Sequence, residues 1–270
     1  MNFFQAIFLG LIQGLTEFIP VSSSGHLVLA QHFLGIEGGG DISFEIFMHL
    51  GTLVAVIIFF HRQIWDLIMS LFSWKSGLDG ENHRKNHSIM AYLIIATLAT
   101  GFFYLIFGDL LKGAYDKPLF VAFMLLFTGI LIFVSDFVKN TSTPSSNIGI
   151  IKSVLIGLAQ GIAIIPGISR SGSTISASLF CGVKRKDAAH FSFLLSIPAI
   201  LAANIGELES LMALDMSVLH IYLAGLVASF VSGYMVIAFL IRLIQSGSLK
   251  YFAYYVWLIS LLAITLILIG

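Results

Sequence analysis

Long apolar stretches alternate with short polar ones along most of this chain. Six stretches are long enough to cross a hydrocarbon core about 30 Å thick. They lie at 44–60, 88–111, 118–135, 188–206, 218–241 and 251–269. Each predicts a transmembrane helix, because a helix satisfies its backbone hydrogen bonds within its own segment.

Two further apolar regions, 3–35 and 149–183, are interrupted in the middle by proline and glycine. Neither half of either region is long enough to cross a membrane alone. We interpret both as re-entrant helical hairpins, which a membrane protein tolerates where they are buried in protein or line a cavity. A single kinked span over 3–35 is the main alternative.

The two interrupted regions carry the same short motif. The first copy, at 10–26, reads GLIQGLTEFIPVSSSGH, and the second, at 157–174, reads GLAQGIAIIPGISRSGST. Without a gap the alignment pairs Gly10 with Gly157 and Ser22 with Ser169. Broken apolar segments in corresponding positions of two halves indicate where a membrane protein binds its ligand.

Three predicted spans separate the two hairpins, and an odd number places the hairpins on opposite sides of the membrane. The sequence therefore predicts an all-α integral membrane protein with six transmembrane helices and two broken re-entrant hairpins in an inverted repeat. We expect a single membrane domain over 1–270, with a first repeat at 1–140 and a second at 149–270.

Composition supports a polytopic membrane protein. The chain is 58% hydrophobic and 10% charged, whereas a soluble domain carries roughly a quarter charged residues. Its net charge is zero and no basic block suggests nucleic acid. The start MNFFQAIFLG has no basic segment, which predicts that no signal peptide is present. The single Cys181 excludes an internal disulfide.

Basic residues fall mainly in the loops on one side of the predicted topology. These loops, at 61–87, 139–152, 184–187 and 242–250, hold eleven of the fourteen Lys and Arg residues: Arg62, Lys75, Arg84, Lys85, Lys139, Lys152, Lys184, Arg185, Lys186, Arg242 and Lys250. The positive-inside rule makes that side cytoplasmic. Both termini and the opening of the first hairpin are then expected outside, and the second hairpin enters from the cytoplasm.

Three ionisable side chains lie close to the breaks of the two hairpins: Glu17, His26 and Arg170. Such groups are costly in a bilayer and usually functional. A purely structural Glu17–Arg170 pair is the plain alternative. After each break a new half-helix begins at a serine cluster, and helix N-termini bind phosphate. The planar guanidinium fork of Arg170 suits phosphate oxygens. The residues expected to bind phosphate are Ser22, Ser24, Gly25, Ser169, Ser171, Gly172 and Thr174.

Each of these residues also has an ordinary structural role open to it. Serine is a common helix cap, and Thr174 can bond to its own helix.

Gln13 and Glu17, four residues apart, share a helix face. Glu17 can act as a base or hold a divalent cation, while Gln13 can only ligate weakly. Glu45 and His49 either extend this site or lie at the interface.

A serine in this cluster can attack phosphorus, with His26 or Glu17 handling the proton. Ser23 aligns with Arg170 across the repeat, so we favour Ser23 over Ser22 as nucleophile and His26 as its proton partner. Attack by an activated water is the competing mechanism.

These residues resemble the undecaprenyl-diphosphate phosphatase family, the integral-membrane bacitracin-resistance proteins. Its (E/Q)xxxE motif is matched by Gln13 to Glu17, followed by PVSSSGH at 20–26, and its PGxSRSxxT motif by 166–174. The resemblance covers essentially the whole chain. It points to Glu17, Ser22 or Ser23, His26 and Arg170 as catalytic residues. Gln13 is the amide form of the first motif residue, which puts a mechanism with two carboxylates in doubt.

The resemblance implies hydrolysis of a polyprenyl diphosphate lipid to its monophosphate and inorganic phosphate, with a divalent cation, Mg²⁺ or Ca²⁺. It further implies a multi-pass protein of the bacterial cytoplasmic membrane, with its active site opening outward. Such an enzyme recycles the carrier lipid for cell-wall synthesis and confers bacitracin resistance. The sequence leaves a homo-oligomer open.

A polyprenyl-phosphate flippase or another secondary transporter is the alternative, since such proteins also use inverted repeats with broken helices. The serine-rich hairpin that carries His26 favours the enzyme, because a phosphatase needs a nucleophile and proton handling. A structural scaffold ranks last, because it gives Glu17 and Arg170 no purpose.

Overall fold

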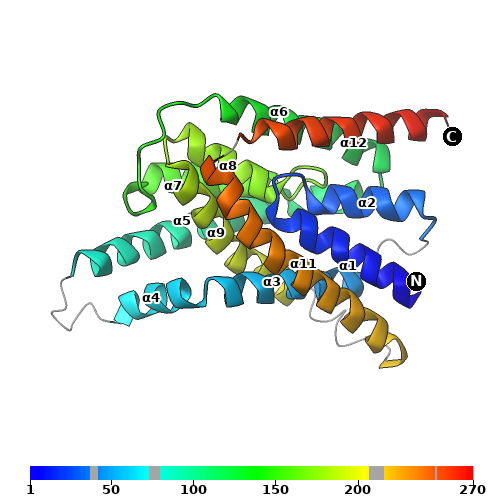
Figure 1. Ribbon diagram of the computed structural model, residues 1–270, viewed down its shortest axis with the longest axis horizontal. Helices are drawn as coiled ribbons and strands as arrows, with labels where there is room; N and C mark the ends of the chain where they lie inside the picture. Colours follow the sequence, from blue (N-terminus) through cyan, green and yellow to red (C-terminus); the bar gives the residue numbers. More distant parts are fainter. Residues whose placement is uncertain (37–41, 73–79, 207–215, 247, 270) are drawn as a thin grey trace.

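The computed structural model describes residues 1–36, 42–72, 80–206, 216–246 and 248–269, and this part of the chain is helical (Figure 1). Its extended pairing is limited to one isolated bridge between Thr143 and Val183. The predicted class, an all-α integral membrane protein, is confirmed.

Five helices in the described ranges are long and apolar enough to cross a membrane. They are α5 (Glu81–Leu111), α6 (Pro118–Asp136), α9 (Arg185–Gly206), α11 (Leu219–Ser246) and α12 (Lys250–Ile269). They correspond to five of the six predicted spans. The remaining one, 44–60, lies on α3 (Ile42–Phe59), which is followed after Phe60 by α4 (His61–Phe72).

The bend between α3 and α4 is 77°, and the pair counts as one broken span or as a re-entrant loop. The prediction that 61–87 is a loop is therefore wrong in part, because it contains α4 and the start of α5. Hydropathy missed α4 because its apolar residues recur on one face, with Arg62 and Asp66 between them.

Both interrupted regions form hairpins, as predicted. The first consists of α1 (Phe3–Phe18) and α2 (Ser23–Phe33), and the second of α7 (Ile150–Ile162) and α8 (Arg170–Phe180). Within each hairpin the two helices pack against each other. The first region is therefore not a single kinked span. In Figure 1 the two hairpins enter from opposite ends of the molecule and meet in its middle.

The tips of the hairpins are in direct contact. Ser171 Oγ donates to the Ile19 carbonyl oxygen at 3.0 Å, and Gly167 N donates to Ser24 Oγ at 3.5 Å. A Cβ added at Gly25 would lie 3.2 Å from the Gly167 Cα. Glycine at 25 is therefore what allows the two breaks to touch.

Glycines matched across the repeat lie where each hairpin packs on a long helix. α1 packs on α11, and α7 packs on α5. A Cβ at Gly10 would fall on the Gly225 carbonyl oxygen of α11, and one at Gly157 on the Ala96 carbonyl oxygen of α5. Small residues let membrane helices approach closely enough for dispersion contacts to hold them together.

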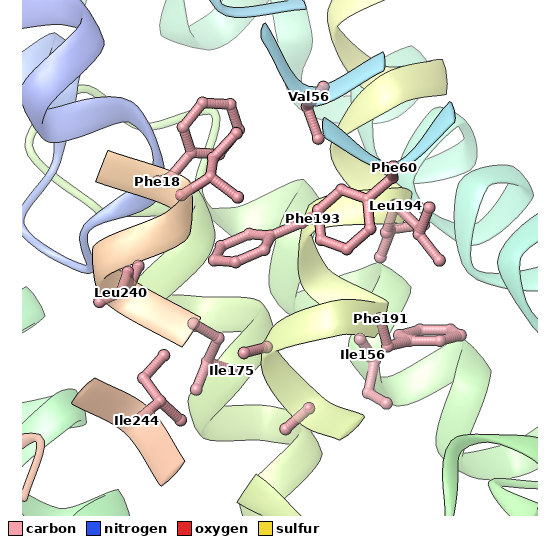
Figure 2. Close-up of a cluster of buried hydrophobic side chains, with 14 of the residues drawn as sticks. Phe18, Val56, Phe60, Ile156, Ile175, Phe191, Phe193, Leu194, Leu240 and Ile244 are labelled. Carbon is pink, nitrogen blue, oxygen red and sulfur yellow. The ribbon is translucent and has the colours of Figure 1, made fainter. Parts of the chain in front are cut away.

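The largest apolar cluster lies between the hairpins and α9 (Figure 2). Phe193 of α9 packs edge-on against Phe18 at 5.6 Å between ring centroids and also contacts Phe60. Because Phe18 follows Glu17 directly, this cluster fixes the end of α1 where the polar site begins.

The predicted basic loops gather at one end of the molecule. Figure 1 shows the connections around 139–149, 181–184 and 248–249 at one end, and both chain termini at the other. Arg185 Nη1 donates to Asp136 Oδ1 at 2.7 Å, and Leu249 N donates to the same oxygen at 3.0 Å. Asp136 thus ties the ends of α6, α9 and α12 together at the basic end.

Replacing Gly10 by alanine should destabilise the protein, because the added methyl group forces α1 away from the Gly225 carbonyl oxygen. We expect a loss of about 1–3 kcal/mol, typical of overpacking, measured by thermal unfolding in detergent. The matched control is Gly101→Ala on α5, where an added Cβ meets nothing within 4 Å. It should unfold at or slightly above the wild-type temperature. Equal melting temperatures for both variants would contradict the close-packed seam.

Candidate active site

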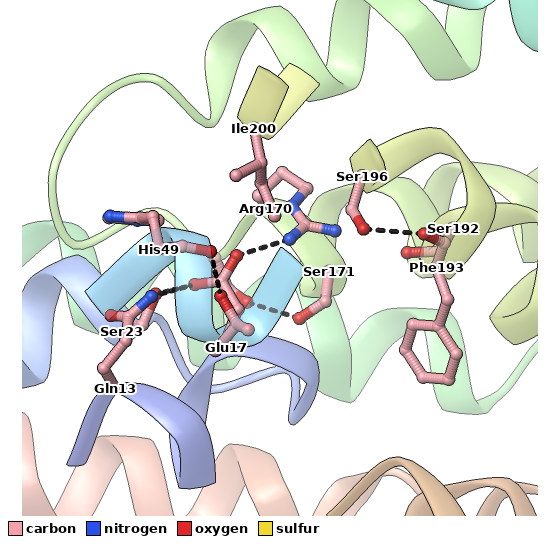
Figure 3. Close-up of polar contacts among 12 residues, drawn as sticks. Gln13, Glu17, Ser23, His49, Arg170, Ser171, Ser192, Phe193, Ser196 and Ile200 are labelled. Atoms are coloured by element: carbon pink, nitrogen blue, oxygen red, sulfur yellow. Dashed lines mark hydrogen bonds and ion pairs between the residues drawn. The ribbon is translucent and has the colours of Figure 1, made fainter. Parts of the chain in front are cut away.

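The Glu17 carboxylate lies in the last turn of α1 and joins three segments of the chain (Figure 3). Gln13 Nε2 donates to Glu17 Oε2 at 2.9 Å, and Ser23 Oγ donates to the same oxygen at 2.6 Å. Arg170 Nη2 donates to Glu17 Oε1 at 2.5 Å. The Glu17 and Arg170 side chains are 6% and 16% exposed, so this is a buried ion pair across the two hairpins.

Local structure places each member of this network. Gln13 and Glu17 are one helical turn apart on α1. Ser22 has φ 72°, the only positive value for a non-glycine residue in the described part of the chain. Such a conformation is strained and clusters at functional sites. It turns the chain so that Ser23, the first residue of α2, reaches Glu17. Arg170 is the first residue of α8.

Two buried polar atoms of this network have no hydrogen-bond partner among the described residues: Arg170 Nη1 and Gln13 Oε1. Leaving such a group unpaired costs about 1–3 kcal/mol, more when it is charged. In Figure 3 the free end of Arg170 points away from Glu17, toward the side where Ser171 and Ser196 lie. A guanidinium with a spare donor beside a serine hydroxyl fits an anionic ligand such as phosphate.

The residues predicted to bind phosphate surround the two hairpin tips, but most of their hydroxyls already have partners. Ser22 and Ser169 cap α2 and α8 by accepting from Gly25 N at 3.2 Å and Gly172 N at 3.0 Å. Thr174 Oγ1 donates to the Arg170 carbonyl oxygen of its own helix at 2.9 Å and also lies within hydrogen-bond distance of Ser192 Oγ. Its hydroxyl therefore takes the ordinary structural role of bonding to its own helix. Each cap satisfies one of the four N–H groups that a helix start leaves free.

His26 has different neighbours from those we expected. Its Nδ1 lies 2.8 Å from the Ser22 carbonyl oxygen, and its Nε2 lies 3.1 Å from the Tyr255 hydroxyl. Ser23 is bonded to Glu17 instead. The structure therefore pairs the favoured serine with Glu17 and does not pair it with His26.

Two neighbours of the site were missed from the sequence. Thr128 of α6 donates to the Gly167 carbonyl oxygen at 2.8 Å and accepts from Ser169 N at 3.0 Å, so it holds the second break in place. Tyr255 of α12 contacts His26. Each lies in an apolar span, where a lone hydroxyl more often bonds to its own helix, so no sequence signal marked them.

The two uncertain residues lie on α3, which packs on α1, the helix that carries Glu17. His49 Nδ1 lies 2.9 Å from the Glu45 carbonyl oxygen of its own helix, and Figure 3 draws His49 in the same polar cluster as Glu17. This placement favours the interpretation that His49 extends the polar site.

Two residues of α1, Glu17 and Gln13, carry the side-chain oxygens of this network that would ligate a divalent cation. In the described ranges no three His, Cys, Asp or Glu side chains come together as a metal site. Glu17 and the unpartnered Gln13 Oε1 offer oxygen ligands on one helix face. Mg²⁺ is typically held by one or two carboxylates together with substrate phosphates and water. Glu17 and Gln13 are therefore the residues of this network that would hold such a cation.

Comparison with known proteins gives one consistent result. Residues 6–262 match the family described as Bacitracin resistance protein BacA. An undecaprenyl-diphosphatase of Treponema denticola is 43% identical over 94% of both chains. One of Methanobrevibacter smithii is 39% identical over 97% of this chain and 96% of its own. One of Alkaliphilus metalliredigens is 38% identical over 98% of both chains. The chain belongs to the bacitracin resistance protein BacA family.

Proposed function

We propose that this protein hydrolyses undecaprenyl diphosphate, or a closely related polyprenyl diphosphate, to the monophosphate and inorganic phosphate. One observation carries the proposal. Ser23 donates to a buried carboxylate, Glu17, which also holds an arginine with a spare buried donor. A nucleophile, a base and an anion clamp are thus within one hydrogen-bonded network. The similarity to proteins named undecaprenyl-diphosphatase supports the same substrate.

Arg170 changes partners in the proposed reaction. Its Nη1 binds an oxygen of the terminal phosphate, and the phosphate competes with Glu17 for the rest of the guanidinium. Glu17 then loses part of its ion pair and becomes a better proton acceptor. Substrate binding therefore activates the base that is hydrogen-bonded to Ser23.

Ser23 Oγ attacks the terminal phosphorus while Glu17 takes its proton. The bond from phosphorus to the bridging oxygen breaks, and the lipid monophosphate leaves with the electron pair. Water then cleaves the phosphoserine and releases inorganic phosphate, and Ser23 regains its proton. In the competing mechanism Glu17 activates a water that attacks the same phosphorus directly.

If Glu17 is a metal ligand and not the base, a divalent cation held by Glu17, Gln13 and the diphosphate would neutralise negative charge on the phosphates as the bond breaks. Arg170 shares this task from the opposite hairpin. Gly25 and Gly167 bring the two breaks into direct contact beside these residues.

The arrangement of the ends supports an outward-facing site in a cytoplasmic membrane. The basic loops at the end opposite the termini favour a cytoplasmic location by the positive-inside rule. The first hairpin then opens outward, where a carrier lipid released by cell-wall synthesis presents its diphosphate. Hydrolysis there would recycle the lipid and lower the amount available to bacitracin.

A flippase is the second candidate function, because two broken hairpins meet in the middle of the molecule from opposite ends. It needs no nucleophile. Phosphate release separates the two activities.

Purified protein should release phosphate from undecaprenyl diphosphate, and a chelator should stop the reaction until Mg²⁺ or Ca²⁺ is restored.

Glu17→Gln should lose about 10²- to 10⁴-fold in turnover, as expected for loss of a general base. Arg170→Lys, which keeps the charge and loses the fork, should lose about 10²-fold or more.

The exposed variants Glu81→Gln and Arg62→Lys are the matched controls and should behave as wild type. No phosphate release by the wild type, with transfer of labelled lipid across proteoliposomes, would favour the flippase instead.

Ser23→Ala should lose about 10³-fold or more in turnover, because electrostatic stabilisation alone is a weak catalyst. Ser22→Ala should chiefly lose stability, by about 1 kcal/mol, because it removes the cap on Gly25 N. Turnover is compared at equal amounts of folded protein. Unchanged turnover in Ser23→Ala would point to direct attack by water.

The orientation can be tested in a Cys181→Ala background. Figure 1 shows the connection between α5 and α6 at the end that holds the termini, and the connection that follows α6 at the basic end. A cysteine at the exposed Asp116 in the first connection should react with an impermeant thiol reagent on intact spheroplasts. A cysteine at the exposed Ser142 in the second should react only after the membrane is opened. The opposite labelling pattern would reverse the proposed side of the site.

A further inference from the structure

Thr128 of α6 uses its buried hydroxyl to bond to the second hairpin. The hydroxyl donates to the Gly167 carbonyl oxygen at 2.8 Å and accepts from Ser169 N at 3.0 Å. A threonine in an apolar helix more often donates to a carbonyl oxygen one turn back, as Thr97 does to Leu93 on α5. Because a hydroxyl has a single hydrogen, Thr128 gives up that bond to its own helix in order to hold another segment.

The two groups that Thr128 binds lie directly before Arg170. Ser169 is the N-cap of α8, where its hydroxyl accepts from Gly172 N at 3.0 Å, and Arg170 is the first helical residue. Gly167 has φ 92°, a backbone conformation that residues with a side chain rarely adopt. Thr128 therefore fixes the unusual turn of the break and the cap that starts α8. Together these set the point from which the Arg170 side chain extends.

The same face of α6 also supports the first hairpin. Val121, Leu125 and Thr128 are spaced four and three residues apart, so they share one face of the helix. A Cβ added at Gly25 would lie 2.9 Å from Leu125 Cδ2, and one added at Gly167 would fall on the Val121 carbonyl oxygen. α6 thus contacts both breaks, and Thr128 is the residue of this face that hydrogen-bonds to the second.

We propose that Thr128 is a positioning residue for the phosphatase reaction, acting through Arg170 by holding the backbone from which the guanidinium reaches Glu17 and the terminal phosphate. This inference rests on the proposed function. Arg170 Nη2 donates to Glu17 Oε1 at 2.5 Å, and Ser23 Oγ donates to Glu17 Oε2 at 2.6 Å. The start of α8 is therefore linked to the proposed nucleophile through one carboxylate.

Loss of the hydroxyl would release the start of α8. The Gly167 carbonyl oxygen and Ser169 N–H would lose their shared partner, and the break would shift toward other partners because buried polar groups are costly to leave unpaired. Arg170 would move with the backbone. A misplacement of about 1 Å at a reacting centre costs about 10²-fold in rate.

The test compares two substitutions of Thr128 in purified protein with undecaprenyl diphosphate. Thr128→Val keeps the shape and removes the hydroxyl, and it should lower kcat about 10- to 10²-fold. Thr128→Ser keeps the hydroxyl and should stay within about threefold of wild type, since both bonds can still form. Thr97→Val is the matched control, because it removes a hydroxyl that bonds to its own helix. It should leave kcat unchanged.

Kinetics are compared at equal amounts of folded protein, so a purely structural role for Thr128 would leave kcat per folded molecule at the wild-type value. A second arm repeats Thr128→Val in an Arg170→Lys background, where the planar fork is already lost. If Thr128 acts through Arg170, the added substitution should lower kcat by less than about twofold.

Three outcomes overturn the inference: wild-type kcat in Thr128→Val, a loss in Thr128→Ser as large as that in Thr128→Val, or an equal loss from Thr128→Val in both backgrounds. A wild type that releases no phosphate overturns the proposed function instead, and the inference with it.

Discussion

The ion pair between Glu17 and Arg170 is the interaction on which this structure depends most. Both side chains are largely removed from water. Taking a charge out of water costs several kcal/mol, so each partner needs the other, and removing one leaves an uncompensated buried charge. The pair therefore fixes the tip of the first hairpin against the tip of the second. Every other contact of the site is arranged around that constraint.

Broken helices in a membrane interior expose backbone groups, and this fold satisfies them with side chains from neighbouring helices. Thr128 pairs both the carbonyl oxygen of Gly167 and the N–H of Ser169. Ser171 pairs the carbonyl oxygen of Ile19. Glycines let the supporting helices come close enough for these bonds to form. These bonds hold the backbone of both hairpin breaks in place.

The chemistry gathers where the two halves differ. Gln13 corresponds to Gln160, but Gln13 donates to Glu17 whereas Gln160 donates to Thr100. The position matched to Glu17 is Ile164, and Ser23 is matched to Arg170. The repeat supplies two similar hairpins with serine caps. Departures from the repeat supply a carboxylate on one side and a guanidinium on the other, and these meet because the hairpin tips are in contact.

The sequence by itself determined the membrane class, the two hairpins and most residues of the proposed site. Continuous apolar runs, proline breaks and a repeated motif are local signals, and the cost of burying Glu17 and Arg170 marks them without any structure. It did not reveal α4, whose apolar residues are periodic rather than continuous. Nor did it reveal that Ser23 bonds to Glu17, that Thr128 bonds to the second hairpin break, or that Tyr255 contacts His26. Those pairings join residues far apart in the chain or depend on the positive φ of Ser22. Only the packing of α6 and α12 against the hairpin tips decides them, because a hydroxyl in an apolar span finds its partner by proximity.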